Sequence, residues 1–361
     1  MPKRTRLLLV AVGMTLAACA GRPADTATTG ESRTPAADTT AATVPATLTI
    51  ISHDSFAAGV TEETFAAFTD ATGIEVELLP AGDAGSMVNQ AILTKDNPLA
   101  DVLFGVDDTF LSRALDAGIF VGHRSPMLSE VPDELERDPA VTPIDFGDVC
   151  INYDRAVFTA SSPPVALEQL ALPRFAGQLV VENPATSSPG LAFLLATIAT
   201  FGEDGWKGYW RDLVDNGVKV VSDWDTAYYG EATWWGGERP LVVSYASSPP
   251  AEVIFSEEPL DQAPTGVMDE SCYRQIEFAG VLAGTEYPQA AGELIDFMLS
   301  PGFQAQIPLT WFVFPANENV ELPREFVEHT VIPDSPHSLD PADIDANRER
   351  WIREWTEIVL P

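Results

Sequence analysis

The chain has 361 residues, of which 54 are acidic and 20 are basic, so its formal net charge is −34. Such a chain has no basic surface for a phosphate backbone, which excludes nucleic acid as a partner. A cationic ligand is compatible with this negative field, although many secreted proteins are acidic only for solubility. The length that remains after the first 46 residues suits two lobes rather than one core.

The first residues are typical of a bacterial secretion signal. Three basic residues precede a short apolar run, which is too short for a membrane-spanning helix. The run ends in LAAC, which resembles the lipobox of bacterial lipoproteins and implies cleavage before Cys19 and lipidation of its thiol. Ordinary signal cleavage is the alternative. We therefore expect a signal peptide over 1–19 and an extracytoplasmic chain, lipid-anchored to the outer face of the cell membrane.

Residues 20–46 are rich in Thr, Ala and Pro and contain almost no large apolar side chain. Such a segment buries too little surface to offset its ordering entropy, so it predicts a flexible tether.

The next part of the chain alternates apolar strands with helical patterns. The strands are predicted over 47–56, 74–80 and 100–107, and the helices over 61–73, 86–95 and 109–118. This alternation favours an α/β lobe with a mainly parallel sheet. Ligands of such sheets bind beyond the carboxyl ends of the strands, where Asp54, Ser55 and Asp107 stand.

The second part of the chain is also predicted to contain both strands and helices. Further strands are predicted over 145–154, 178–184, 218–224, 240–250 and 271–284, with helices over 206–217, 287–308 and 341–360. The last helix carries aromatic residues at helical spacing, which indicates core packing.

The segment TSSPGLAFLL has a pattern typical of a helix N-terminus. Ser187 or Ser188 can act as N-cap, Pro189 suits the first turn, and the apolar run supplies a buried stripe. The free N–H groups at such a start attract anions, so the segment is either a ligand site or only a well-capped helix.

Two cysteines remain once Cys19 is assigned to lipid. Cys150 and Cys272 then form a pair in an oxidising compartment, which predicts a disulfide. Metal binding is not expected at either, because no His or Cys lies near them in sequence.

Several fragments, in the same order, resemble thiamine-binding proteins of bacterial ABC importers. They are HDSFAAG, ADVLFGVD, NPATSSPGLAFLL, LVVSYASSP, SPGFQAQIP with FVFPAN, and the tail ANRERWIREWTEIV. The resemblance spans nearly the whole folded part, from Leu48 to Val359. It implies a two-lobed type II periplasmic-binding-protein fold of the α/β class, with mixed sheets and a hinge that places Cys150 beside Cys272.

The resemblance also implies the lobes and the partners. Thiamine or a thiamine phosphate is the expected ligand, and an ABC permease with its ATPase is the expected partner; we expect a monomer with no cofactor, no bound metal and no catalysis. The implied boundaries are lobe I over 47–145, lobe II over 146–271, a return to lobe I over 272–315 and C-terminal helices of lobe II over 316–361.

The family pattern implies roles for particular residues. Trp224 and Tyr245 would face the thiazolium cation, with Tyr228 as a further candidate. Asp107 either binds the ligand or caps the helix that begins at Thr109, and Asp54 with Ser55 either line the cleft or shape a loop. The full set of expected ligand-binding residues is Asp54, Ser55, Asp107, Ser187, Ser188, Gly190, Trp224, Tyr228, Tyr245, Ser248, Trp311 and Phe312.

Ser187, Ser188 and the backbone near Gly190 would receive the hydroxyl or phosphate tail. No Lys or Arg lies in this segment, so a phosphate would depend on N–H groups and hydroxyls alone.

Four positions depart from the pattern. His53, Val60 and Ala251 stand where the family has aromatic side chains, and Trp311 is one step from the usual aromatic position, which Phe312 occupies. Either Trp234, Trp235 or Trp311 supplies the missing stacking ring, or the ligand is a relative of thiamine.

Three other functions stay open. Tyr228 and Tyr229, with His53 and Glu231, are hard ligands of the kind that hold ferric iron. A secreted hydrolase lacks support, because the chain has no G-x-S-x-G, H-E-x-x-H or P-loop motif. A structural surface lipoprotein or adhesin fits the tether but not the aromatics placed after strands.

Overall fold

The computed structural model describes residues 44–158 and 162–360. The predicted signal peptide, Cys19 and nearly all of the predicted tether lie outside these residues. One compact unit spans Thr43–Pro361, so the predicted boundaries between the lobes stay a prediction. Within the described residues, no helix combines the length and the apolar character that crossing a membrane requires.

The first elements confirm the predicted alternation of strands and helices. Strand β1 is parallel to both β2 and β3, so the three carboxyl ends meet at one edge. The strands are β1 (Thr47–Ser52), β2 (Glu75–Pro80) and β3 (Val102–Asp107), and the helices that follow them are α2 (Ala66–Thr72), α3 (Ala84–Leu93) and α4 (Leu111–Asp116).

The segment after β1 differs from the prediction. The expected polar loop is a short helix, α1 (Asp54–Gly59), because the His53 side chain accepts a hydrogen bond from the Phe56 N–H and caps it. The following helix begins at Ala66 and not at Thr61, since the residues before it form a turn in which Thr64 accepts from the Thr61 N–H. Gly73 ends the helix in the left-handed conformation, as predicted.

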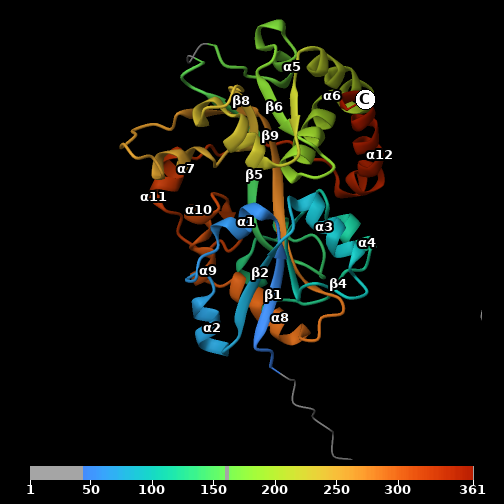
Figure 1. Cartoon of the computed structure of the whole chain (residues 1–361), viewed down its shortest axis with the longest axis vertical. Coiled ribbons are helices and arrows are strands. Elements are labelled where there is room, and N and C mark those ends of the chain that lie inside the picture. The colour runs from blue at the N-terminus through green and yellow to red at the C-terminus, as the bar shows by residue number, and fades with distance from the viewer. Residues whose placement is uncertain (1–43, 159–161, 361) are drawn as a thin grey trace, which may run out of the picture. The chain divides into compact units, whose positions relative to one another are not determined.

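Two long antiparallel strands, β5 (Thr142–Asp154) and β9 (Thr265–Leu282), run through the centre of the molecule (Figure 1). They join the parallel strands on one side to a second group on the other, so the sheet is continuous in the order β2-β1-β3-β9-β5-β8-β6-β7. The mixed α/β class is confirmed. The resemblance implied mixed sheets, and the structure joins them into one continuous mixed sheet, because the predicted crossing strands pair with each other along most of their length.

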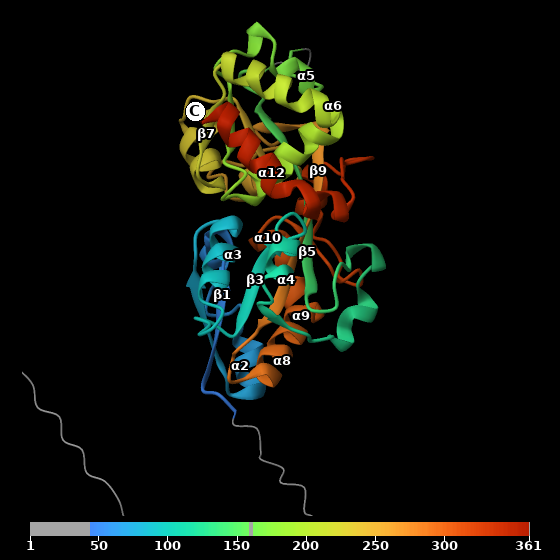
Figure 2. The same ribbon diagram turned by 90° about the vertical axis from the view of Figure 1, so that its right-hand side faces the viewer.

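The second group contains β6 (Leu179–Glu182), β7 (Lys219–Val221) and β8 (Leu241–Tyr245). It is covered by α6 (Ser188–Asp215) and by the C-terminal helix α12 (Pro341–Val359), which lie close together in Figure 2. Trp355 packs edge-on against Trp210 with ring centroids 5.4 Å apart, which confirms the core role predicted for the C-terminal aromatics. Two predicted helices are one element with a kink at Gly202.

The remaining helices and strands are short. The predicted helical pair over 287–308 is three helices, and the segments around 249–254 and 324–329 are additional helices. These elements are α5 (Leu167–Leu170), α7 (Pro249–Ile254), α8 (Pro288–Met298), α9 (Pro301–Gln304), α10 (Ile307–Thr310), α11 (Arg324–His329), β4 (Phe120–Val121), β10 (Phe314–Pro315), the π-helix η4 (Thr226–Glu231), and the 3-10 turns η1 (Pro126–Glu130), η2 (Asp133–Leu135), η3 (Pro173–Phe175) and η5 (Thr233–Trp235).

A disulfide joins Cys150 of β5 to Cys272 of β9, two residues that are 122 positions apart. Both side chains are fully buried, and they pack with Ala246 next to the end of β8. The predicted pairing is therefore present in the structure, on the two strands that connect the halves of the sheet.

Candidate functional site

A cavity of about 340 Å³ lies at the carboxyl ends of β1 and β8, beside the central strands. Its walls come from α1, the residue before α3, the first turn of α6, the turn that leads into η4, and the end of α10. The volume is at the lower end of the range for small-molecule sites. Position and size therefore fit a small ligand held at the strand ends.

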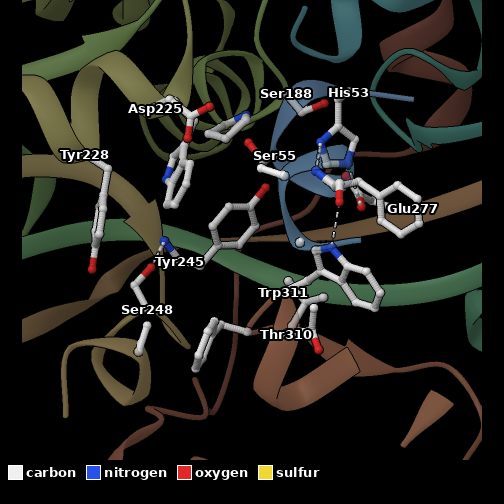
Figure 3. Close-up of a pocket in the computed structure, with 18 of the residues that line it drawn as sticks. His53, Ser55, Ser188, Asp225, Tyr228, Tyr245, Ser248, Glu277, Thr310 and Trp311 are labelled. Atoms are coloured by element: carbon white, nitrogen blue, oxygen red, sulfur yellow. Dashed lines mark hydrogen bonds and ion pairs between the residues drawn. The ribbon is translucent and has the colours of Figure 1, made fainter. Parts of the chain in front are cut away.

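Aromatic rings form two walls of this cavity. Trp224 stacks on Tyr228 at 4.9 Å between centroids, and its indole N–H donates to Ser244 at 2.9 Å. On the other side Trp311 stacks on Phe56 at 4.8 Å and donates to the Phe56 carbonyl at 3.0 Å. In Figure 3, Tyr228 and Tyr245 lie on one side and Trp311 lies on the other. These hydrogen bonds fix the planes of both indoles.

Acidic side chains outnumber basic ones in the lining of the cavity. Four carboxyl groups line it, and its lining residues include no Lys or Arg; the four are Asp83, Asp145, Asp225 and Glu277. Carboxylates in a site of low dielectric attract a cation far more strongly than they do in water. The cavity is therefore suited to a ligand that carries a positive charge on an apolar body.

A hydrogen-bonded chain crosses the floor of the cavity. The Tyr245 hydroxyl donates to Gln275 Oε1 at 3.1 Å, and Gln275 Nε2 donates to Glu277 Oε1 at 3.2 Å. The other oxygen, Glu277 Oε2, lies 3.5 Å from His53 Nε2. The chain therefore links β8 to α1 through β9 and holds the Glu277 carboxylate in one orientation.

His53 is held in place by its cap and by a glycine. Its burial lowers the pKa of the imidazole, but the nearby carboxyls of Glu277, Asp83 and Asp225 raise it more, so the net pKa lies above the usual range. Gly105 has a left-handed φ of 98°, and a Cβ at this position would overlap the His53 ring. A glycine is therefore required behind the imidazole.

Asp107 stabilises the turn before α4 and does not cap that helix, which begins at Leu111 and not at Thr109 and has no side-chain cap. Its Oδ1 accepts from the Thr109 hydroxyl at 2.6 Å and from the N–H groups of Thr109 and Phe110 at 3.0 Å each. The side chain is fully buried, and burial raises the pKa of this carboxyl to about 6. Asp107 lies behind the wall of the cavity and does not line it.

Some residues of TSSPG stabilise the start of α6, and others line the cavity. Ser187 is the N-cap of α6, and Gly190 packs so closely on the Glu182 carbonyl that a side chain would not fit. Ser188 and Pro189 line the cavity, and the buried Ser188 hydroxyl has no hydrogen-bond partner in the part of the chain that the structure describes. It lies close enough to Asp107 to lower the pKa of that carboxyl, without hydrogen-bond geometry. Ser188 is therefore free to bind a ligand.

The structure brings most of the predicted site residues together. Those that line the cavity are Ser55, Ser188, Trp224, Tyr228, Tyr245, Ser248, Trp311 and Phe312. Those that lie outside the lining are Asp54, Asp107, Ser187 and Gly190; Asp54 is exposed and accepts from the Gly82 N–H at 3.0 Å.

The positions that depart from the family pattern also differ in whether they line the cavity. His53 and Ala251 line the cavity and Val60 does not, and of the three tryptophans considered as replacements only Trp311 reaches it.

The carboxyl groups of the cavity were not predicted from the sequence. Asp145 and Glu277 each interrupt an apolar strand, in TPIDFG and RQIEFAG, and this was the available signal. Asp83 caps α3 through the Ala84 N–H, and its second oxygen accepts from the Trp224 N–H at 3.4 Å.

The residues considered for ferric iron do not form one set. Glu231 pairs with Lys219 at 2.5 Å and does not line the cavity. The Tyr228 hydroxyl donates to Glu252 at 2.6 Å, and Tyr229 is half exposed. No group of three or more His, Cys, Asp or Glu side chains in the described ranges is arranged to hold a metal ion.

Comparison with known proteins places the chain among bacterial binding proteins. A family model described as bacterial extracellular solute-binding protein matches residues 97–258. The thiamine-binding periplasmic protein of Escherichia coli K12 is 32% identical over 317 residues, covering 86% of this chain and 93% of the relative. That of Brucella suis is 29% identical and covers 86% and 91%.

Solved structures agree on the fold. A periplasmic thiamin binding protein superposes with a TM-score of 0.77 at 28% identity, covering 87% of this chain and 96% of the other. Iron-bound HitA from Pseudomonas aeruginosa superposes with a TM-score of 0.71 at 20% identity. At this low identity the comparison shows a shared fold and nothing about the ligand.

Proposed function

Because this chain belongs to the family of thiamine-binding periplasmic proteins, we propose that it captures thiamine outside the cytoplasmic membrane and delivers it to an ABC importer. The observation that supports this ligand most strongly is the lining of the cavity, which combines carboxyl groups with aromatic rings and contains no Lys or Arg. Thiamine carries a permanently cationic thiazolium between a flat aminopyrimidine and a hydroxyethyl tail. The carboxyl groups of the lining suit the positive charge, and its aromatic rings suit the two flat rings of thiamine.

The thiazolium is proposed to lie against Trp224 and Tyr245, near the Glu277 carboxylate. A cation on a desolvated aromatic face gains about 2 kcal/mol, and a nearby carboxylate adds attraction in the low dielectric. Trp311 and Phe56 offer a second face for the aminopyrimidine ring. This arrangement replaces the rings that the family has at His53 and Ala251.

The tail is proposed to reach Ser188 at the start of α6. A hydroxyl can pair with the unpartnered Ser188 hydroxyl. A phosphate would gain from the helix N-terminus but would enter a cavity with four carboxyl groups and no cation. We therefore expect unphosphorylated thiamine to bind more tightly than its monophosphate, and the monophosphate more tightly than the diphosphate.

Delivery is proposed to follow hinge closure. A ligand that contacts both walls stabilises the closed state, and the permease then recognises that state. The lipobox supports anchoring at Cys19, which would keep the protein beside its permease on the outer face of the membrane. The signal peptide, the tether, the lobe boundaries and a monomeric state remain parts of this proposal.

Thermal unfolding of the purified protein tests the ligand. Thiamine at a hundred times its dissociation constant should stabilise the fold by about 2.7 kcal/mol, which raises the Tm by several degrees. The mono- and diphosphate should give smaller shifts at the same concentration. A shift with Fe³⁺ but with no form of thiamine would contradict the proposal, and a larger shift with the diphosphate would contradict the assignment of the tail.

A further inference from the structure

The further inference concerns two carboxyl groups on the floor of the cavity. Asp145 of β5 stands directly opposite Glu277 of β9 in the antiparallel register, and both line the cavity. Residues in this relation have neighbouring side chains, and like charges there destabilise the pair. Two ionised carboxylates in this buried position are therefore unfavourable, and one of them is expected to keep its proton.

An N–H group lies beside each oxygen of Glu277. Gln275 donates to Oε1, and the orientation of its amide is fixed because its own oxygen accepts from Tyr245. His53 Nδ1 accepts from the Phe56 N–H, so the ring N–H is at Nε2, which faces Glu277 Oε2 at 3.5 Å. Glu277 therefore has one hydrogen bond, from Gln275, and one ion-pair contact, with His53.

Asp145 has the opposite surroundings. Only 4% of the residue is exposed, and its Oδ1 has no hydrogen-bond partner among the described residues. Burial raises the pKa of this carboxyl well above its usual range, and the charge of the neighbouring Glu277 raises it further. Burial without a donor, opposite a second carboxyl group, therefore favours the protonated form of Asp145 in the ligand-free protein.

No Lys or Arg among the described residues lines the cavity beside these groups. The titratable side chains that face the pair are His53 before α1, Asp83 before α3, Asp107 at the end of β3, Asp225 before η4 and Tyr245 on β8. The two residues of β10, Phe314 and Pro315, carry no charge. The neighbouring cation of β9, Arg274, is paired with Asp148 at 2.6 Å.

We propose that Asp145 loses its proton when the cationic ligand binds, so that capture of thiamine is coupled to proton release. This inference rests on the proposed function. The O–H bond of Asp145 breaks, its proton passes to solvent, and the new carboxylate is balanced by the arriving positive charge. The net charge of the cavity is thus the same before and after binding.

The sign of the pH dependence follows from this exchange. The free protein holds one more proton than the complex, so affinity rises with pH between the pKa of Asp145 in the complex and its higher pKa in the free protein. The rise is at most tenfold per pH unit for one proton. Above the upper pKa the affinity is constant, because the acid is already ionised.

Calorimetric titration with thiamine near neutral pH, in buffers of low and high ionisation enthalpy, counts the protons released. For the wild-type protein the observed heat should depend on the buffer with a slope approaching one proton. Asp145→Asn should bind without this dependence, because its amide cannot ionise. The matched control is Asp108→Asn: burial raises the pKa of Asp108 to about 7, but it does not line the cavity, so the slope should persist.

The outcomes separate this inference from the function on which it rests. Binding heat with no buffer dependence in the wild-type protein, or a dependence that persists in Asp145→Asn, would overturn proton release while leaving thiamine binding intact. No binding in any buffer would overturn the proposed function itself. Infrared difference spectra test the same step in the wild-type protein, without a variant. Binding of thiamine should remove the carbonyl band of a protonated carboxyl group. An unchanged band would contradict proton release.

Discussion

Replacing Trp224 with alanine should weaken thiamine binding by about 2–3 kcal/mol, or roughly 30- to 150-fold in Kd. The indole is fixed by its stack on Tyr228 and its hydrogen bond to Ser244, so its face is presented to the cavity without an entropic cost on binding. Removing it takes away the cation–π contact and admits water beside the thiazolium. Equilibrium titration of wild-type and variant protein measures the difference.

Two further variants separate loss of the ring from loss of structure. Trp224→Phe keeps an aromatic face but loses the hydrogen bond to Ser244, so its Kd should fall between those of the wild type and the alanine variant. Trp235→Ala is the matched control, because Trp235 is half exposed and does not line the cavity. Equal losses for Trp224→Ala and Trp235→Ala would contradict a contact between Trp224 and the ligand.

The double variant Cys150→Ala, Cys272→Ala should lose about 5 kcal/mol of free energy of unfolding. The disulfide closes a loop of 122 residues, and the chain-entropy account gives this magnitude for a loop of that length. The two alanines should also leave a small void, since both side chains are fully buried. Denaturant unfolding of the variant beside the oxidised wild type measures the loss.

Chemical reduction provides the control for this prediction. Wild-type protein unfolded and refolded with a reductant keeps its side chains but loses the bond, so its stability should match that of the double variant to within about 1 kcal/mol. A double variant as stable as the oxidised protein would show that the bond contributes nothing to the free energy of unfolding.

The order of strands and helices could be predicted because it depends on local patterns. Apolar runs and caps such as Gly73 are visible in the sequence, and the start of α6 was placed to within one residue. That one residue matters for the site. Ser187 turns inward as the N-cap and Ser188 turns to the cavity, and no periodicity distinguishes two adjacent serines. The α1 helix was missed because its cap is a histidine, which is an uncommon N-cap.

The aromatic part of the site could be predicted from the family pattern, whereas its acidic part could not. Trp224, Tyr245 and Trp311 stand in fragments that resemble the family, and they line the cavity. Asp145 and Glu277 lie more than a hundred positions apart and meet only through the register of β5 and β9. A single sequence does not contain that register, because both strands are long and carry bulges.

The cavity is proposed to recognise the positive charge of thiamine. Comparing the affinity for thiamine with that for its uncharged isostere, in which a thiophene ring replaces the thiazolium, tests this recognition. The two molecules share shape, pyrimidine and tail, so the difference isolates the charge. The acidic, aromatic lining predicts that thiamine binds at least about 30-fold more tightly, from a cation–π contact of about 2 kcal/mol. Equal affinity for the two, or tighter binding of the uncharged molecule, would contradict it.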